Sequence, residues 1–201
     1  MDKFQDIEKA KIKIMGKNGQ GVYVGNNLFL TAAHCINFKT SGSMVLGDHF
    51  IEDIEIQGQR FRVAPWAIEP ISDIAVLGPL DDQVFPDDAD RLEDFCEDLN
   101  PALINTVEPE LFQEFEIHVF SHEGGQVPGK GEVCSPGSKS LFIETKDEIK
   151  GGTSGGPIVD ESGGLVGIVS NFSGNDNTGV HPRPHLTLPL WVLRKLEGAA
   201  L

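Results

Sequence analysis

The chain has 201 residues, which is enough for one ordinary domain or two small ones with a buried core. Its formal net charge of −15 excludes a general affinity for nucleic acid and disfavours binding to anionic membranes, because both partners need clustered lysine and arginine. Residues 1–9 lack the apolar core of a secretion signal, and no apolar run is long enough to cross a bilayer. We therefore expect a soluble, unsecreted protein of the cytoplasm.

The three cysteines are an odd number and widely spaced, with no C-x-x-C pair. This pattern indicates neither a disulfide framework nor a zinc knuckle, and we expect Cys35 to be a free, buried thiol. Two histidines four positions apart, His181 and His185, could suggest a metal site, but Pro182 and Pro184 exclude a helix that would bring both onto one face. No carboxylate spacing completes a site, so we expect neither a metal nor another cofactor.

In residues 1–80, short apolar or alternating runs separated by glycine and asparagine turns predict an all-β half. The strand at 28–31 is followed by small residues and then by His34, which we expect on a short helical turn. Asp73 stands directly before an unbroken apolar run that is typical of a buried strand. The strands expected here are 11–14, 22–24, 28–31, 43–46, 51–56, 59–63 and 74–77.

Residues 81–102 form an acidic segment, in which nine acidic residues stand against the single base Arg91. Two interpretations are open: a docking surface for a basic partner or substrate, or a solvated linker between two halves. Leu92, Phe95 and Leu99 recur at helical spacing, which predicts one short amphipathic helix within this linker.

The second half, residues 103–201, again contains short runs typical of strands. The stretch 124–131 is rich in glycine and contains proline, which predicts a surface loop. A polar hairpin is expected at 171–179 and an amphipathic helix at 188–196. The strands expected in this half are 115–120, 141–144, 157–159 and 165–170.

Ser154 lies between glycines and shortly before an apolar run, which suits a nucleophile on a tight turn that substrate backbone can approach. A serine hydroxyl needs a base to remove its proton, and neutral imidazole suits that role near pH 7. A carboxylate behind the ring fixes the required tautomer. His34, Asp73 and Ser154 provide these groups in that order. The G-x-S-x-G nucleophile elbow also matches, but it needs Asp and His after the serine and βαβ alternation, and the chain shows no such alternation.

Three motifs resemble those of the trypsin/chymotrypsin-like serine peptidases. The family's T-A-A-H-C, D-I-A-x-L and G-x-S-G-G-P patterns stand at 31–35, 73–77 and 152–157. The resemblance implies an all-β fold of two six-stranded antiparallel β-barrels with a C-terminal helix. The barrel of residues 1–80 would carry the histidine and the aspartate, and that of residues 103–201 the serine. The implied activity is that of a serine endopeptidase acting on a protein or peptide substrate.

The resemblance also implies roles for residues around the triad. Backbone N–H groups of Gly152 and Ser154 would form the oxyanion hole. The Ser170 hydroxyl would support the catalytic aspartate, and its backbone would bind the substrate as an added strand.

The floor of the pocket for the side chain before the cut maps to Glu148, and its walls include Gly179 and His181. A carboxylate in a narrow, partly dry pocket is satisfied by lysine or arginine, so the resemblance predicts cleavage after basic residues. Lys150 stands close enough along the chain to neutralise Glu148. Two alternatives stay open: His181 pointing into the pocket would favour an acidic side chain, and Glu148 on the surface would leave a pocket for small apolar side chains.

Thr153 occupies a position where secreted relatives use an aspartate to capture a new N-terminus after activation cleavage, and no I-V-G-G-like segment is present upstream. We therefore expect a peptidase that folds active or is switched by a regulatory protein partner, as in the bacterial branch of the family. Because fold does not imply function, a second class of function is kept open, that of a catalytically silent binding or scaffold module.

Overall fold

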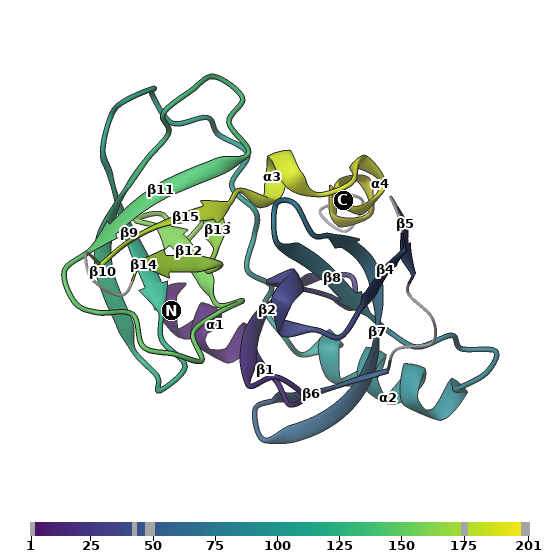
Figure 1. The fold of residues 1–201 in the computed structure, drawn as a ribbon. Coiled ribbons are helices and arrows are strands. Elements are labelled where there is room, and N and C mark those ends of the chain that lie inside the picture. The colour runs from purple at the N-terminus through teal and green to yellow at the C-terminus, as the bar shows by residue number, and fades with distance from the viewer. Residues whose placement is uncertain (1–2, 42–43, 47–50, 174–176, 198–201) are drawn as a thin grey trace.

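The chain folds into two β-rich halves with helices at both of its ends (Figure 1). The computed structural model describes residues 3–41, 44–46, 51–173 and 177–197. The expected architecture is confirmed, with a closed first barrel and a nearly closed second one. No helix in these ranges is long and apolar enough to cross a membrane.

The first barrel has the strand order β1-β2-β3-β8-β7-β6, with antiparallel neighbours throughout. Strands β3 and β8 are buried along their whole length, which explains their unbroken apolar sequences, whereas β6 alternates. The strands match the expected positions closely, although β2 and β7 are longer than expected. Their bounds are Lys11–Ile14 (β1), Gly19–Gly25 (β2), Leu28–Thr31 (β3), Glu52–Ile56 (β6), Gln59–Glu69 (β7) and Ile74–Gly78 (β8).

Two short features follow β3. The 3-10 helix η1 (Ala33–Cys35) is the helical turn expected around the histidine. Strands β4 (Lys39–Ser41) and β5 (Met44–Leu46) pair with each other outside the barrel sheet. Strand β5 agrees with the strand expected at 43–46, of which Ser43 lies outside the described residues.

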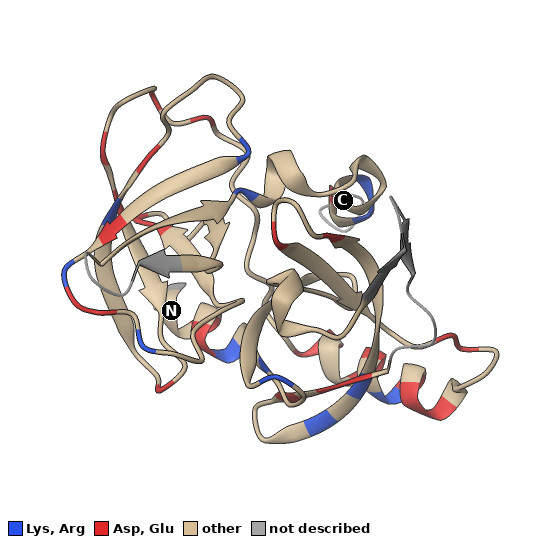
Figure 2. Ribbon diagram, viewed as in Figure 1, with Lys and Arg blue, Asp and Glu red and all other residues tan. Residues whose placement is uncertain are grey.

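The acidic segment contains helix α2 (Pro86–Glu97), as its apolar spacing predicted. Leu92 is fully buried, and Phe95 packs on Phe61 of β7 with ring centroids 4.8 Å apart. Most of the acidic side chains of α2 are exposed, and Figure 2 shows red segments along this helix. The helix therefore covers part of the first barrel with its apolar side and presents carboxylates to water.

The second half is one seven-stranded antiparallel sheet in the order β13-β12-β9-β10-β11-β15-β14. Its last strand, β14, pairs with β15 as in the expected hairpin, whose residues 174–176 lie outside the described residues. The strands are Phe115–Phe120 (β9), Gln126–Glu132 (β10), Ser140–Thr145 (β11), Pro157–Asp160 (β12), Leu165–Ile168 (β13), Asn171–Ser173 (β14) and Thr178–Pro182 (β15).

The prediction of a surface loop at 124–131 was wrong, because most of this stretch belongs to strand β10. Gly129 explains the difference. A Cβ atom at this position would lie 2.4 Å from the carbonyl oxygen of Glu144 on β11, so glycine is needed for the two strands to approach. Glycine, which is typical of turns, here allows two neighbouring strands to pack closely.

The two ends of the chain bind opposite halves of the molecule. Helix α1, which the sequence did not predict, packs Phe4 against His118 of β9 with ring centroids 4.7 Å apart. The expected C-terminal helix, α4, packs on the first barrel, where the rings of Trp191 and Trp66 lie 6.3 Å apart. These crossed contacts hold the halves together. Helix α1 spans Lys3–Ala10 and helix α4 spans Leu190–Glu197. A short helix, α3 (Pro184–Thr187), precedes α4.

Candidate active site

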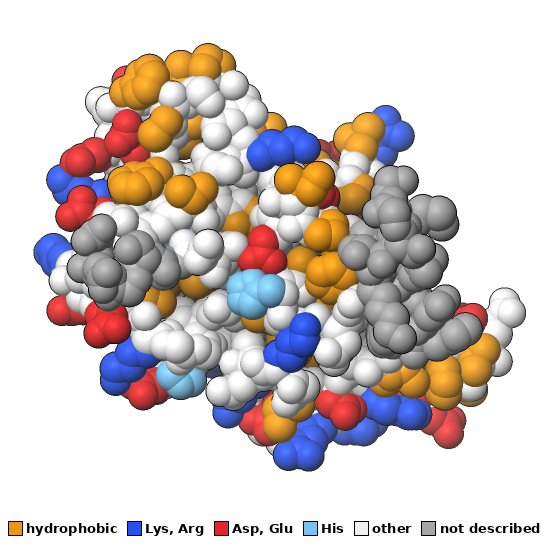
Figure 3. All heavy atoms as spheres, in the orientation of Figure 1, with side chains coloured by type: hydrophobic (Ala, Val, Ile, Leu, Met, Phe, Trp, Pro, Cys, Tyr) orange, Lys and Arg blue, Asp and Glu red, His pale blue; other side chains and the backbone are white. Residues whose placement is uncertain are grey.

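A cleft of about 800 Å³ lies between the two halves. His34 and Asp73 line it from the first barrel, and Ser154 and Ser170 line it from the second. On the face that Figure 3 shows, a histidine and an acidic side chain lie next to each other near the middle, and many of the other charged side chains lie toward the edge. The fold thus brings together four residues that are distant in the sequence.

His34 and Asp73 are joined by two hydrogen bonds. His34 Nδ1 lies 2.7 Å from Asp73 Oδ2, and the His34 backbone N–H donates to Asp73 Oδ1 at 2.9 Å. The Ser170 hydroxyl donates to the same Oδ2 atom. A carboxylate at Nδ1 favours the tautomer with its proton there, which leaves Nε2 as a proton acceptor. The His34 side chain is 49% exposed, so its ring is accessible.

The turn between β7 and β8 presents Asp73. Both carboxylate oxygens of Glu69 accept backbone hydrogen bonds, from Ile71 at 3.3 Å and from Ser72 at 2.6 Å. Asp73 has a φ of +54°, in the left-handed region that aspartate tolerates better than most residues. The Ala33 N–H donates to the Asp73 carbonyl at 3.3 Å, which ties this turn to the helix η1.

Ser154 lies in the middle of a tight turn. The Gly156 N–H donates to the Thr153 carbonyl at 2.9 Å, so Ser154 and Gly155 are the central residues. Gly155 has the positive φ, +83°, that a type II turn requires at its third position, and a Cβ there would lie 2.0 Å from the Gln20 carbonyl oxygen. The Gln20 N–H donates to the Ser154 carbonyl at 2.7 Å. Strand β2 therefore supports this turn from the first barrel.

The preceding turn leaves two backbone donors available. The Thr153 N–H donates to the Lys150 carbonyl at 3.3 Å, and Gly152 between them has a φ of +90°, again as in a type II turn. The Gln20 side-chain amide donates to the Gly152 carbonyl at 3.3 Å. No described residue accepts a hydrogen bond from the N–H of Gly152 or of Ser154.

Ser154 and His34 line the same cleft, but no hydrogen bond joins these two described residues. Catalytic hydrogen bonds are often long until substrate binds. The neighbouring thiol is a poor nucleophile, because Cys35 is buried and burial raises its pKa to about 11. Its Sγ atom donates to the Ser154 carbonyl at 3.4 Å, and it is a free thiol, as expected.

The predicted pocket residues do not all lie together. Ser170 and His181 line the cleft, whereas Glu148 is exposed and lies outside its lining. Lys150 forms its ion pair with Glu123, at 2.6 Å, and not with Glu148. The structure thus places neither Asp147 nor Glu148 in the lining of the cleft.

His181 is a buried, neutral wall of the cleft. Burial lowers its pKa to about 3, and its Nδ1 accepts the Ser170 N–H at 3.0 Å. Gly179 lies outside the cleft lining but makes room for this ring, since a Cβ there would lie 2.5 Å from His181 Nε2. The described residues hold no group of three or more His, Cys, Asp or Glu placed for a metal ion.

Sequence reasoning missed Gln20 and Glu69, which hold the turns of the site. Gln20 contacts Gly152, 132 positions further along the chain, so no motif could reveal it. Glu69 bonds to N–H groups two and three positions further on, and this local spacing could have suggested a turn.

The paired barrels, with His34, Asp73 and Ser154 on the cleft between them, define a protein of the chymotrypsin fold. The family described as the trypsin-like peptidase domain matches residues 19–168, and the chain belongs to this family. A search of curated proteins found no match.

Solved structures share the fold at low sequence identity. The active form of the Rv3671c protease from M. tuberculosis is 17% identical, with a TM-score of 0.60, and the match covers 98% of this chain and 83% of that one. The serine endoprotease from Yersinia pestis is 20% identical, with a TM-score of 0.60 and coverages of 100% and 68%. A serine protease of a human pathogenic astrovirus is 17% identical, with a TM-score of 0.55 and coverages of 89% and 91%.

Proposed function

We propose that this protein is a serine endopeptidase that hydrolyses peptide bonds through His34, Asp73 and Ser154. The observation that carries the proposal is the 2.7 Å contact of His34 Nδ1 with Asp73 Oδ2 in the cleft that Ser154 also lines. His34 Nε2 takes the proton of the Ser154 hydroxyl as its oxygen attacks the substrate carbonyl carbon. Asp73 stabilises the imidazolium that forms.

The N–H groups of Gly152 and Ser154 stabilise the negative charge that develops on the substrate carbonyl oxygen. His34 then gives its proton to the leaving amine, and the acyl group stays on Ser154. Water, activated by His34, attacks this acyl group and releases the second product. In this proposal the substrate backbone binds beside Ser170 as an added strand.

For the residue before the cut, we propose a small apolar side chain. The only carboxylate among the described lining residues is Asp73, which His34 already engages, so lysine or arginine would find no partner. The apolar lining residues that support this preference are Ile149, Val169 and Val180. A positional-scanning peptide library tests it: enrichment of lysine or arginine that Glu148→Gln abolishes would show that Glu148 sets the preference.

We also propose that the peptidase works in the cytoplasm. The three cysteines, Cys35, Cys96 and Cys134, are free thiols, and two of them are buried. Free thiols suit a reducing compartment, whereas secreted domains of this size usually carry disulfides.

A fluorophosphonate probe, which reacts with activated serines, tests the activity. We expect labelling of the wild type and none of Ser154→Ala. With a peptide substrate, Ser154→Ala, His34→Ala and the double variant should lose similar amounts of activity, because triad members act as a unit. Additive losses would contradict a shared mechanism. A folded wild type that the probe never labels would be a silent binding module.

A further inference from the structure

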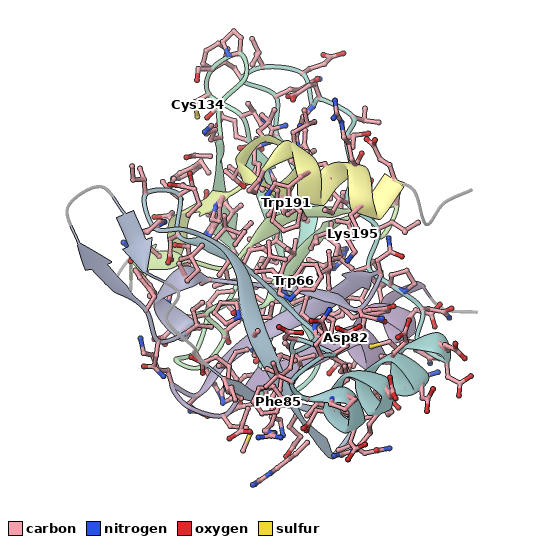
Figure 4. All side chains as sticks on the ribbon, turned by 90° about the vertical axis from the view of Figure 1, so that its right-hand side faces the viewer. Trp66, Asp82, Phe85, Cys134, Trp191 and Lys195 are labelled. Carbon is pink, nitrogen blue, oxygen red and sulfur yellow. The ribbon has the colours of Figure 1, made fainter. Side chains whose placement is uncertain are left out.

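A groove of about 530 Å³ lies on the first barrel, between β7, the segment after β8, and α2. It shares no lining residue with the cleft that holds Ser154. Figure 4 shows Trp66 between α4 and α2, with Asp82 and Phe85 toward α2. The groove combines an apolar floor of Ala64, Trp66, Pro79, Leu80 and Ala89 with an acidic rim of Asp81, Asp82, Asp90 and Glu93.

The apolar floor is held in place before anything binds. The Trp66 Nε1–H donates to the Pro79 carbonyl at 2.9 Å. Gly78 lets the indole lie against β8, since a Cβ there would lie 2.8 Å from the ring. Leu80 and Ala89 are both buried. A preformed surface loses little conformational entropy on binding, which favours a ligand.

The aromatic edge of the groove already carries a positive charge from its own chain. Lys195 Nζ of α4 lies 4.1 Å from the Trp66 ring centroid, in a cation–π contact. Trp191 lies beside the same ring. A cation of the chain itself therefore already occupies this part of the Trp66 ring, and the cationic group of a ligand would bind at the acidic rim instead.

The acidic rim is not neutralised by its neighbours. None of the four rim carboxylates forms an ion pair with a described residue, whereas nearby Asp88 pairs with Arg62. Arg91, the single base of this segment, donates to the Arg60 carbonyl and lies over the Phe61 ring instead. Four carboxylates therefore surround the apolar floor without a cationic partner.

We propose that this groove docks a segment of a protein substrate in which lysine or arginine stands next to an apolar residue. The apolar side chain packs on Ala64, Trp66 and Pro79, which are only partly buried, and the cationic groups meet the rim carboxylates. That the partner is a substrate rests on the proposed peptidase function. Pro70, which lines the active-site cleft, follows Trp66 by roughly 13 Å of extended chain, so one polypeptide can reach both sites.

Binding can be measured without catalysis, in the Ser154→Ala protein. The only two tryptophans of the chain, Trp66 and Trp191, both belong to this region, so tryptophan emission reports occupancy. The probe is a short peptide of lysine, leucine and glycine, and its matched control has glutamate in place of lysine. We expect a saturable change with the lysine peptide alone, which weakens as salt screens the charges. No change, or an equal change with the glutamate peptide, would overturn the proposal.

A matched pair of variants distinguishes the effect of the groove on peptide binding from the effect of the chain's net charge. The rim variant is Asp82→Asn/Asp90→Asn/Glu93→Gln, and the control variant is Glu110→Gln/Glu144→Gln/Glu161→Gln, which removes as many exposed carboxylates elsewhere. The Kd of the lysine peptide should rise about tenfold in the rim variant and stay within about twofold in the control. An unchanged Kd in the rim variant, or equal weakening in both, would overturn the proposal.

Hydrolysis distinguishes a failure of this proposal from a failure of the peptidase. With a basic protein substrate, the rim variant should raise KM and leave kcat unchanged, and short substrates that fill only the cleft should be cut as by the wild type. Binding of the lysine peptide without hydrolysis of any substrate would support docking at the groove and contradict the proposed peptidase activity. Hydrolysis that occurs with no effect of the rim variant on KM or Kd would support the peptidase activity and contradict docking at the groove.

Discussion

Asp73→Asn probes how His34 is oriented for its proposed role as a base. In the wild type, Asp73 Oδ2 accepts from His34 Nδ1 and from the Ser170 hydroxyl, and Oδ1 accepts from the His34 backbone N–H. An asparagine that keeps its oxygen on the backbone N–H turns its amide toward the ring. The amide then donates to Nδ1, which places the ring proton on Nε2 and removes the acceptor that Ser154 needs.

We expect Asp73→Asn to lower kcat/KM by on the order of 10⁴, equivalent to about 5.5 kcal/mol of transition-state stabilisation. The wrong tautomer and the missing negative charge beside the imidazolium both contribute to this loss. The fold should survive, since asparagine tolerates the φ of +54° as well as aspartate does. The Ser170 hydroxyl can turn to accept from the new amide, so Tm should change by no more than about 3 °C.

The rate constant of fluorophosphonate labelling measures this effect without a known substrate and should fall in parallel, and thermal unfolding measures stability. Asp53→Asn is the matched control, because Asp53 is exposed and lies outside the cleft lining, and this variant should be labelled at the wild-type rate. If Asp73→Asn keeps more than about a tenth of the wild-type labelling rate at unchanged Tm, another carboxylate orients His34 and the reasoning is refuted.

Gln20→Leu removes the side-chain donor to the Gly152 carbonyl, so labelling should slow about tenfold. Tm should hold, because Gln20 Oε1 has no partner among the described residues; an unchanged labelling rate would show that the turn does not need this side chain. Glu108→Gln deprives buried Arg183 of its charged partner at 2.8 Å, and unfolding should show a loss of about 1.5–3 kcal/mol. The hydrogen bond from Arg183 lowers the pKa of Glu108, so its stabilisation is present above the ordinary value of 4.5 and is lost as the pH falls through the lowered folded value. The difference in Tm between wild type and Glu108→Gln should therefore shrink in that acidic range, and a constant difference would contradict this assignment. Because the three cysteines are free, reductant should leave Tm unchanged, whereas a large drop would reveal a disulfide.

The proposed triad could be predicted from the sequence because each residue stands in a short motif that builds its own local geometry. Gly155 must be glycine, since its φ is positive and the Gln20 carbonyl leaves no room for a Cβ. Most strands could be predicted because burial of one or both faces imposes alternation or an unbroken apolar run. Family resemblance also placed Ser170, whose hydroxyl bonds to Asp73 from 97 positions away.

Only the tertiary structure decided the features that depend on contacts between distant segments. Glu148 is exposed and lies outside the cleft lining, which its position six residues before Ser154 could not show. Gln20 reaches Gly152 across the two barrels, and helix α1 is held by side chains of β9. The glycine-rich stretch can form strand β10 because β11 lies too close to Gly129 for any residue with a Cβ. Such contacts involve partners that are remote along the chain, so they leave no periodic pattern in the sequence.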